Sequence, residues 1–148
     1  MTYPVIEVTA KTTDQELFNA VVTHMLGMDG PCKDERGNCA YRGPGGTACA
    51  VGALLPDSAL ELYDDVISEF LREYRCAVYE SEADEMPELE RLEESEEMLS
   101  ELQDAHDSAE SWNGGLNFAG VKSLLKIADW YCLTPPQALL DKHEELKA

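Results

Sequence analysis

The sequence predicts a single α+β domain over residues 1–148, mostly helical, with a small β-hairpin packed against three or four helices. Apolar residues recur at helical spacing in several separate stretches, whereas two short apolar runs flank a glycine-rich turn. With 148 residues and a hydrophobic fraction of 44%, the chain is long enough to bury a core. Because an isolated hairpin is marginally stable in water, the predicted hairpin must pack on the helices.

The first helix is expected to begin after Thr13. Thr13 and Glu16 have the spacing of a capping box, in which each side chain bonds a backbone amide at the helix start. An apolar stripe at helical spacing follows, formed by Phe18, Val21, Val22 and Met25. Gly27 ends this helix, and His24 beside the stripe is expected to lie at the edge of the core rather than to bind a ligand.

The hairpin is expected at residues 39–51, where two short strands, 39–42 and 47–51, flank the turn residues 43–46. A second capping box, from Ser58 to Glu61, predicts the next helix. The apolar face of that helix comprises Leu60, Tyr63, Ile67, Phe70, Leu71 and Tyr74.

Two more helices are expected near the C-terminus. Asn117 caps the first of them, whose apolar residues are Phe118, Val121, Leu124, Leu125, Ala128 and Tyr131. Thr134 is expected to cap a short terminal helix, because the prolines that follow it have the backbone dihedral of a first helical position. Its apolar residues are Ala138, Leu139 and Leu140.

Negative charge is concentrated in one third of the chain. The net charge is -19, and the segment from Asp57 to Asp107 holds nineteen carboxylates against three cations, Arg72, Arg75 and Arg91. Such a cluster creates a local potential that repels DNA and anionic lipid and attracts cations. We therefore expect no direct binding to nucleic acid and no membrane contact, and basic proteins are the expected partners. A halophilic surface would spread the charge over the whole exterior.

Residues 80–101 hold eleven carboxylates and one cation, Arg91. Residues 80–87 are expected to form a mobile acidic linker, and the rest a helix with one buried seam of Leu89, Leu92, Leu99 and Leu102. At about 1.5 Å rise per residue, one carboxylate falls every ~3 Å, comparable with one charge per roughly 1.7 Å of duplex DNA. A merely solvated face is the alternative. The predicted partner-binding residues are Glu88, Glu90, Glu93, Glu94, Glu96, Glu97 and Glu101.

The cysteines indicate reduced thiols and a cytoplasmic protein. There are five, an odd number, and their spacing is not that of a disulfide framework. Residues 1–11 lack the pattern of a signal peptide, and no stretch approaches the ~18 apolar residues of a membrane span. The oligomeric state is not predicted.

Four residues are candidates for a reactive cluster: Cys39, Cys49, His106 and Asp107. A thiol enzyme needs a nucleophile, a base and an orienting carboxylate, and a zinc site needs four thiolate or imidazole ligands. The long spacing from Cys39 to Cys49 disfavours zinc, and the apolar neighbours of Cys49 favour a buried, inert thiol. We therefore expect no catalytic residues, no metal and no cofactor. A small enzyme that uses Cys49, His106 and Asp107 is the alternative.

Residues 39–57 resemble a pattern of small, mostly uncharacterised proteins of bacteriophages and prophages, C-x-Y-R-G-x-x-G-x-x-C-A-V-G-x-L-I-P-D. Residues 102–107, followed by Trp112, are similar to the L-Q-x-x-H-D motif and the downstream tryptophan of the same group. The chain departs from the pattern at Leu55 and in the length and acidity of the intervening segment. The resemblance implies a phage or prophage origin and the host cytoplasm as the workplace, but no established reaction.

These observations favour a phage-type acidic interaction protein. It is expected to bind and inhibit or modulate a basic host protein that handles nucleic acid, with imitation of a nucleic-acid backbone as the more specific form of this function. The alternative is a small cysteine- and histidine-dependent enzyme of unknown substrate.

Overall fold

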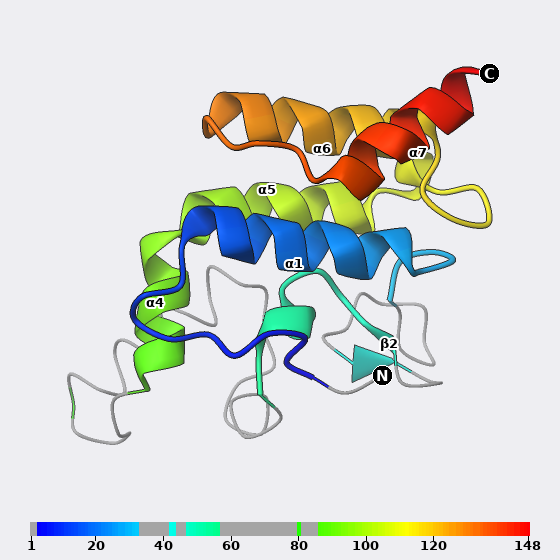
Figure 1. The fold of residues 1–148 in the computed structure, drawn as a ribbon. Coiled ribbons are helices and arrows are strands. Elements are labelled where there is room, and N and C mark those ends of the chain that lie inside the picture. Colours follow the sequence, from blue (N-terminus) through cyan, green and yellow to red (C-terminus); the bar gives the residue numbers. More distant parts are fainter. Residues whose placement is uncertain (1–2, 33–41, 44–46, 57–79, 81–85) are drawn as a thin grey trace.

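The computed structural model describes residues 3–32, 42–43, 47–56, 80 and 86–148 (Figure 1). This part of the chain is mostly helical, as predicted. Its α-helices are α1 (Asp14–Leu26), α4 (Pro87–Glu94), α5 (Glu96–Asp107), α6 (Phe118–Trp130) and α7 (Gln137–Lys147). Two short strands, β1 (Arg42–Gly43) and β2 (Thr47–Ala48), and two 3-10 helices, η2 (Gly52–Leu54) and η3 (Ala109–Ser111), complete the described elements.

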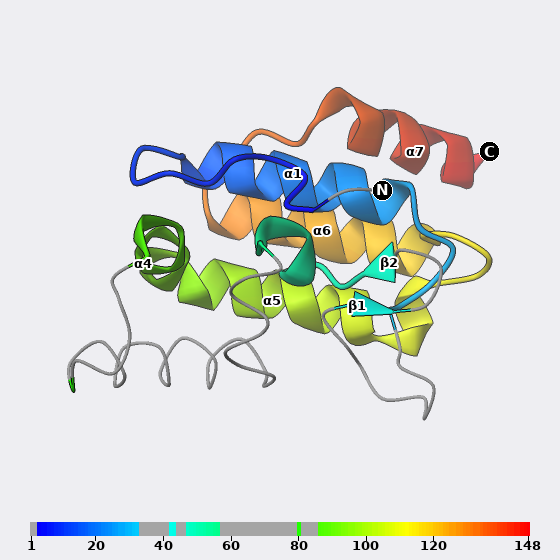
Figure 2. The same ribbon diagram turned by 90° about the horizontal axis from the view of Figure 1, so that it is seen from below.

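Helices α1, α5 and α6 run across the molecule side by side, and α7 lies against α6 and α1 (Figures 1 and 2). The two strands and η2 lie on the opposite side from α7, and η2 packs against α1. One buried cluster extends from Val8 to Leu139 and includes apolar residues of every described α-helix. None of the described helices is long and apolar enough to cross a membrane.

The start of α1 confirms the predicted capping box. The Thr13 hydroxyl accepts a hydrogen bond from the Glu16 amide, and the Glu16 carboxylate accepts one from the Thr13 amide. The predicted apolar stripe of α1 is fully buried. His24 is also buried, and its Nε2 lies 2.8 Å from the Ala48 carbonyl, which ties α1 to β2.

The second strand is shorter than predicted, and residues 39–41 of the predicted first strand lie outside the described residues. β1 and β2 pair antiparallel through Arg42 with Ala48 and Gly43 with Thr47, while the turn between them lies outside the described residues. The predicted continuation of the second strand to Val51 is wrong, because the chain turns after Ala48 and enters η2. Backbone amides of η2 bond the carbonyl and the thiol of Cys49, and the following turn buries Leu54 and Leu55.

Two other predicted segments fall wholly or mainly outside the described residues. The helix with the capping box Ser58–Glu61 is one of them. The predicted acidic linker 80–87 is the other, since only its two ends are described. At its C-terminal end Pro87 is already the first residue of α4, so the helix begins earlier than predicted.

The predicted acidic helix is two helices. Its leucine seam is confirmed, because Leu89, Leu92, Leu99 and Leu102 are all fully buried. The prediction of one continuous helix is wrong, since α4 ends at Glu94, Ser95 leaves the helical conformation, and α5 starts at Glu96. Figure 2 shows α4 end-on while α5 runs across the view, so the chain bends sharply at Ser95.

The C-terminal helices follow the prediction with one correction. The Asn117 side chain accepts a hydrogen bond from the Gly120 amide and caps α6, as predicted. Thr134 does not cap α7, which begins at Gln137 without a side-chain cap and continues to Lys147. Instead, the backbone of Thr134 exchanges two hydrogen bonds of 2.8 Å with the Gln15 amide group, which fixes the α6–α7 connection to α1.

Candidate functional site

The seven predicted partner-binding glutamates lie along α4 and the first half of α5, and we call them the acidic surface. None of them is buried. Glu90, Glu94, Glu97 and Glu101 are exposed, and the other three are partly exposed. Because the chain bends at Ser95, the carboxylates form two groups on two differently directed helices rather than one straight row.

Arg91, the one arginine or lysine of residues 86–107, does not neutralise this surface. All of these residues are described, and they include nine carboxylates. Arg91 is only 7% exposed, because its guanidinium turns inward. It donates to the Thr12 carbonyl, to the Ser95 hydroxyl at 2.8 Å and to the Asp14 carboxylate at 2.8 Å. The positive charge of Arg91 thus lies in the interior, where the guanidinium bonds Thr12, Ser95 and Asp14.

Asp14 completes this buried junction between α1 and the α4–α5 bend. Its carboxylate accepts hydrogen bonds from Ser95 and Arg91, and it lies in the first turn of α1, where the helix dipole favours a negative charge. Partial burial opposes ionisation of Asp14, but the hydrogen bonds from Ser95 and Arg91 and the charge of Arg91 outweigh it and lower its pKa below the usual 3.8. No local pattern in the sequence predicts this junction.

Glu101 faces α6. It accepts a hydrogen bond from the Tyr131 hydroxyl, which lies just beyond the last residue of α6. Partial burial, the hydrogen bond to Glu101 and the charges of nearby carboxylates raise the pKa of Tyr131, so the phenol keeps its proton and acts as a donor. Glu101 is therefore held at the seam between α5 and α6.

The structure brings together three of the four predicted reactive residues, while Cys39 lies outside the described residues. Cys49 is buried beside Cys32 in a small apolar cluster that Trp112 covers. His106 is completely buried at the end of α5, and its Nδ1 lies 3.0 Å from Asp107 Oδ1. Its Nε2 accepts a hydrogen bond of 3.4 Å from the Cys32 backbone amide.

These contacts do not support the catalytic alternative. Because Nε2 of His106 accepts from an amide, its proton resides on Nδ1 and is donated to Asp107. The nitrogen that would act as a base is occupied by Cys32, and the ring is closed to solvent. Burial, first of all, raises the pKa of Cys49 to about 12, and its sulfur accepts a hydrogen bond from the Gly52 amide. A protonated thiol of this kind is a poor nucleophile.

Among the described residues, no three histidine, cysteine or carboxylate side chains are placed to hold a metal ion. The cysteine and histidine cluster instead packs the end of α5 against the loop around Cys32. The indole nitrogen of Trp112 donates to the His106 carbonyl at 2.8 Å, and its ring meets the imidazole edge to face.

Cys49 should therefore react with a thiol reagent far more slowly than Cys132, which is exposed. A pKa of about 12 leaves roughly a thousandth of the thiolate that an ordinary thiol has near neutral pH. The measurement is mass-spectrometric mapping of iodoacetamide labelling over time in the native protein, with the unfolded protein as the control for intrinsic reactivity. Equal labelling rates at Cys49 and Cys132 would contradict the buried environment.

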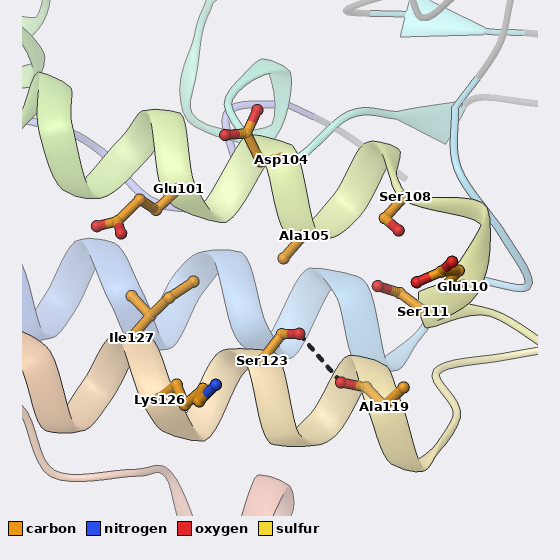
Figure 3. A pocket seen from close by; sticks show the side chains of 10 residues that line it. All are labelled: Glu101, Asp104, Ala105, Ser108, Glu110, Ser111, Ala119, Ser123, Lys126 and Ile127. Carbon is orange, nitrogen blue, oxygen red and sulfur yellow. Dashed lines mark hydrogen bonds between the residues drawn. The ribbon is translucent and has the colours of Figure 1, made fainter.

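A pocket of about 410 Å³ opens between α5, α6 and η3 (Figure 3). We call it the α5–α6 pocket. Its charged residues are Glu101, Asp104, Glu110 and Lys126, and the remaining lining residues are small or apolar: Ala105, Ser108, Ser111, Ala119, Ser123 and Ile127. Of all these, only Glu101 belongs to the predicted partner-binding set.

The wall of the pocket at η3 is fixed by Asn117. The Asn117 amide donates to the Ser111 carbonyl at 2.9 Å, and its side chain donates to the Glu110 carbonyl at 2.7 Å. η3 also lies so close to α6 that a Cβ at Gly120 would come within 2.6 Å of the Ser111 carbonyl oxygen. The cap at Asn117 was recognisable in the sequence, but its second role in holding η3 was not.

Compared with known proteins, the chain matches no family model, no curated protein and no solved structure.

Proposed function

We propose that the protein is an acidic interaction protein, which binds and inhibits or modulates a basic, nucleic-acid-handling protein through the acidic surface of α4 and α5. The observation that carries the proposal is the inward turn of Arg91, which leaves the carboxylates around it without a neighbouring exposed cation in residues 86–107. A group of carboxylates with so little positive charge close by in the sequence produces a negative potential that steers and holds a basic partner.

Two features of α4 support the outward role of its carboxylates. Glu90 makes no hydrogen bond or ion pair with the described residues, and Glu94 is only a loose neighbour of Arg91, at 3.8 Å. A structural role would require contacts that stabilise the fold, and these side chains contribute little of that kind. Mutual repulsion among these carboxylates lowers the stability of the fold, and a basic partner would relieve that repulsion.

The more specific part of the proposal is imitation of a nucleic-acid backbone in the cytoplasm of a phage host. α4 and α5 together carry nine carboxylates over twenty helical residues, so one charge falls every ~3 Å of helix axis. The bend at Ser95 makes this a curved array of charges. The phage or prophage origin rests on the resemblance of residues 39–57 and 102–107.

The complex should weaken strongly as salt is added. Screening shortens the range of the potential from about 10 Å at 0.1 M salt to about 3 Å at 1 M, so the association rate and the affinity should both fall. The measurement is affinity capture from host lysate at low salt, identification of the retained protein, and titration of the purified pair at several salt concentrations. An affinity that does not change with salt would overturn the proposal.

A further inference from the structure

The α5–α6 pocket has an uneven distribution of charge. Figure 3 shows Glu101 and Lys126 toward one end, and Glu110 and Ser111 toward the other. Asp104 adds a third carboxylate on the α5 side, so three negative groups line the pocket against one positive group. Lys126 is exposed and makes no ion pair with any residue that the structure describes, although it lines the same pocket. The end near Glu110 is therefore the more negative one.

The position of the Ser111 side chain indicates that the pocket can bind a ligand. The residue is only 4% exposed, and Figure 3 shows its hydroxyl directed into the space between α5 and α6. Its backbone is satisfied, because its amide donates to the Ser108 carbonyl and its carbonyl accepts from Asn117. Its hydroxyl has no hydrogen-bond partner in the described part of the chain. The hydroxyl keeps some contact with solvent, so a molecule that enters the pocket can bond it in place of water.

The neighbouring polar groups define the chemistry of that occupant. Ser123 donates its hydroxyl proton to the Ala119 carbonyl at 3.1 Å, so its oxygen can only accept a further hydrogen bond. The carboxylate of Glu110 likewise only accepts. A ligand that suits this end of the pocket is thus positively charged and rich in donors. Ala105 and Ala119 supply small apolar surface for a hydrocarbon stem.

We propose that the α5–α6 pocket receives an arginine side chain of the basic partner, with the guanidinium at the end formed by Glu110 and Ser111. This inference rests on the proposed function and names the group that the partner inserts. A guanidinium has five donors in a planar fork and is weakly hydrated, so it suits acceptors on separate elements better than a lysine ammonium does. The pocket volume lies within the range of sites for small ligands.

Lys126 is expected to lower the affinity of the pocket for an arginine side chain. Its ammonium repels a guanidinium in the same pocket, and it is not held by an ion pair with a described residue. Replacing Lys126 with glutamine should therefore tighten binding of an arginine side chain by about threefold. Ser111→Ala removes a hydroxyl acceptor, and Glu110→Gln removes the negative charge opposite the guanidinium, so each should weaken binding by about threefold to tenfold. Ser111→Ala deletes a hydroxyl without a described partner, so the fold should be kept.

The experiment is an NMR titration of the full chain with N-acetyl-arginine amide. The expected result is saturable shifts of amide signals from residues 101–111 and from the first half of α6. N-acetyl-citrulline amide has the same shape without the charge and should produce weak shifts, and N-acetyl-lysine amide should bind less tightly than the arginine compound. Glu7→Gln removes an exposed carboxylate that does not line the pocket, and it is the control variant. Shifts that are equal for arginine and citrulline, or unchanged by Ser111→Ala and Glu110→Gln, would overturn the proposal.

The two proposals fail separately. If a salt-sensitive partner is captured through α4 while blocked arginine causes no shifts at the pocket, the pocket proposal falls and the proposed function stands. If blocked arginine binds the pocket as expected but no basic partner is retained at any salt concentration, the proposed function falls, and with it the assignment of the arginine to a partner.

Discussion

Replacing Glu90, Glu94 and Glu97 together with glutamine is expected to weaken binding of the basic partner by roughly tenfold. All three are exposed members of the acidic surface. An exposed ion pair contributes about 0.2–1 kcal/mol, and three such losses together correspond to about one order of magnitude in affinity. Glutamine keeps a similar helix propensity and side-chain shape, and the relief of repulsion should leave the free energy of unfolding equal or higher.

A matched control separates the acidic surface from the overall charge. Glu7→Gln, Asp29→Asn and Asp129→Asn remove the same number of charges from exposed positions outside α4 and α5. This triple variant should bind the partner with nearly unchanged affinity at physiological salt, where more distant charges are screened. The measurement is titration of both triple variants against the purified partner. Equal losses in the two variants would show that only net charge matters.

Cys49→Ala supplies the contrast with the enzymatic alternative. The thiol is buried, protonated and not bonded to His106 in the described structure, so its removal should cost modest stability and leave partner binding intact. A folded Cys49→Ala protein that had lost all activity, beside a charge-neutralised protein that remained active, would reverse the ranking in favour of an enzyme. The test is to assay the two variants in parallel for inhibition of the same partner.

Local signals predicted the helices well because each was contained in a few neighbouring residues. The capping box at Thr13 and the cap at Asn117 satisfy amides three residues away, and the leucine seam of α4 and α5 follows from helical spacing alone. The exposed positions of the acidic glutamates follow from the same spacing. The predicted cap at Thr134 was equally local but wrong, because the backbone of Thr134 bonds Gln15 of α1 and α7 begins only at Gln137.

The bend at Ser95 could not be predicted, because its cause is distant in the sequence. Ser95 is only an ordinary helix residue by propensity, and its hydroxyl bonds Asp14, which lies in another helix. Arg91 likewise looks like a surface cation in the sequence, yet it is buried by partners that precede it by more than seventy residues. The α5–α6 pocket also depends on tertiary contacts, since Ser111 and Ser123 line one pocket only because η3 packs on α6.

The junction around Arg91 leads to the second large expected effect. Arg91→Ala should lower the free energy of unfolding by about 2–4 kcal/mol, because the buried Thr12 carbonyl and Ser95 hydroxyl lose a charged donor. The ion pair with Asp14 contributes less than these buried contacts, since the Asp14 side chain is 47% exposed and water screens its charge. The free energy of unfolding of Arg91→Lys should lie between those of the wild type and Arg91→Ala, because an ammonium cannot reproduce the planar guanidinium that reaches three partners.

Urea unfolding of the wild type, Arg91→Ala and Glu94→Gln at neutral pH is the direct measurement. Glu94 neighbours Arg91 but is exposed, so its substitution controls for the loss of a charge on α4 and should change stability by less than about 0.5 kcal/mol. If Arg91→Ala were as stable as Glu94→Gln, the buried contacts of Arg91 would not stabilise the fold.

The pH dependence tests the same junction from the side of Asp14. Its pKa is lower in the folded protein than the usual 3.8, so the stabilisation from ionised Asp14 is fully present above that value and is lost as the pH falls through the folded pKa. Acid also relieves repulsion among the other carboxylates, so the informative quantity is the difference in unfolding free energy between wild type and Arg91→Ala. This difference should shrink below about pH 4. A difference that stays constant down to pH 2 would show that ionised Asp14 does not contribute to the stabilisation by Arg91.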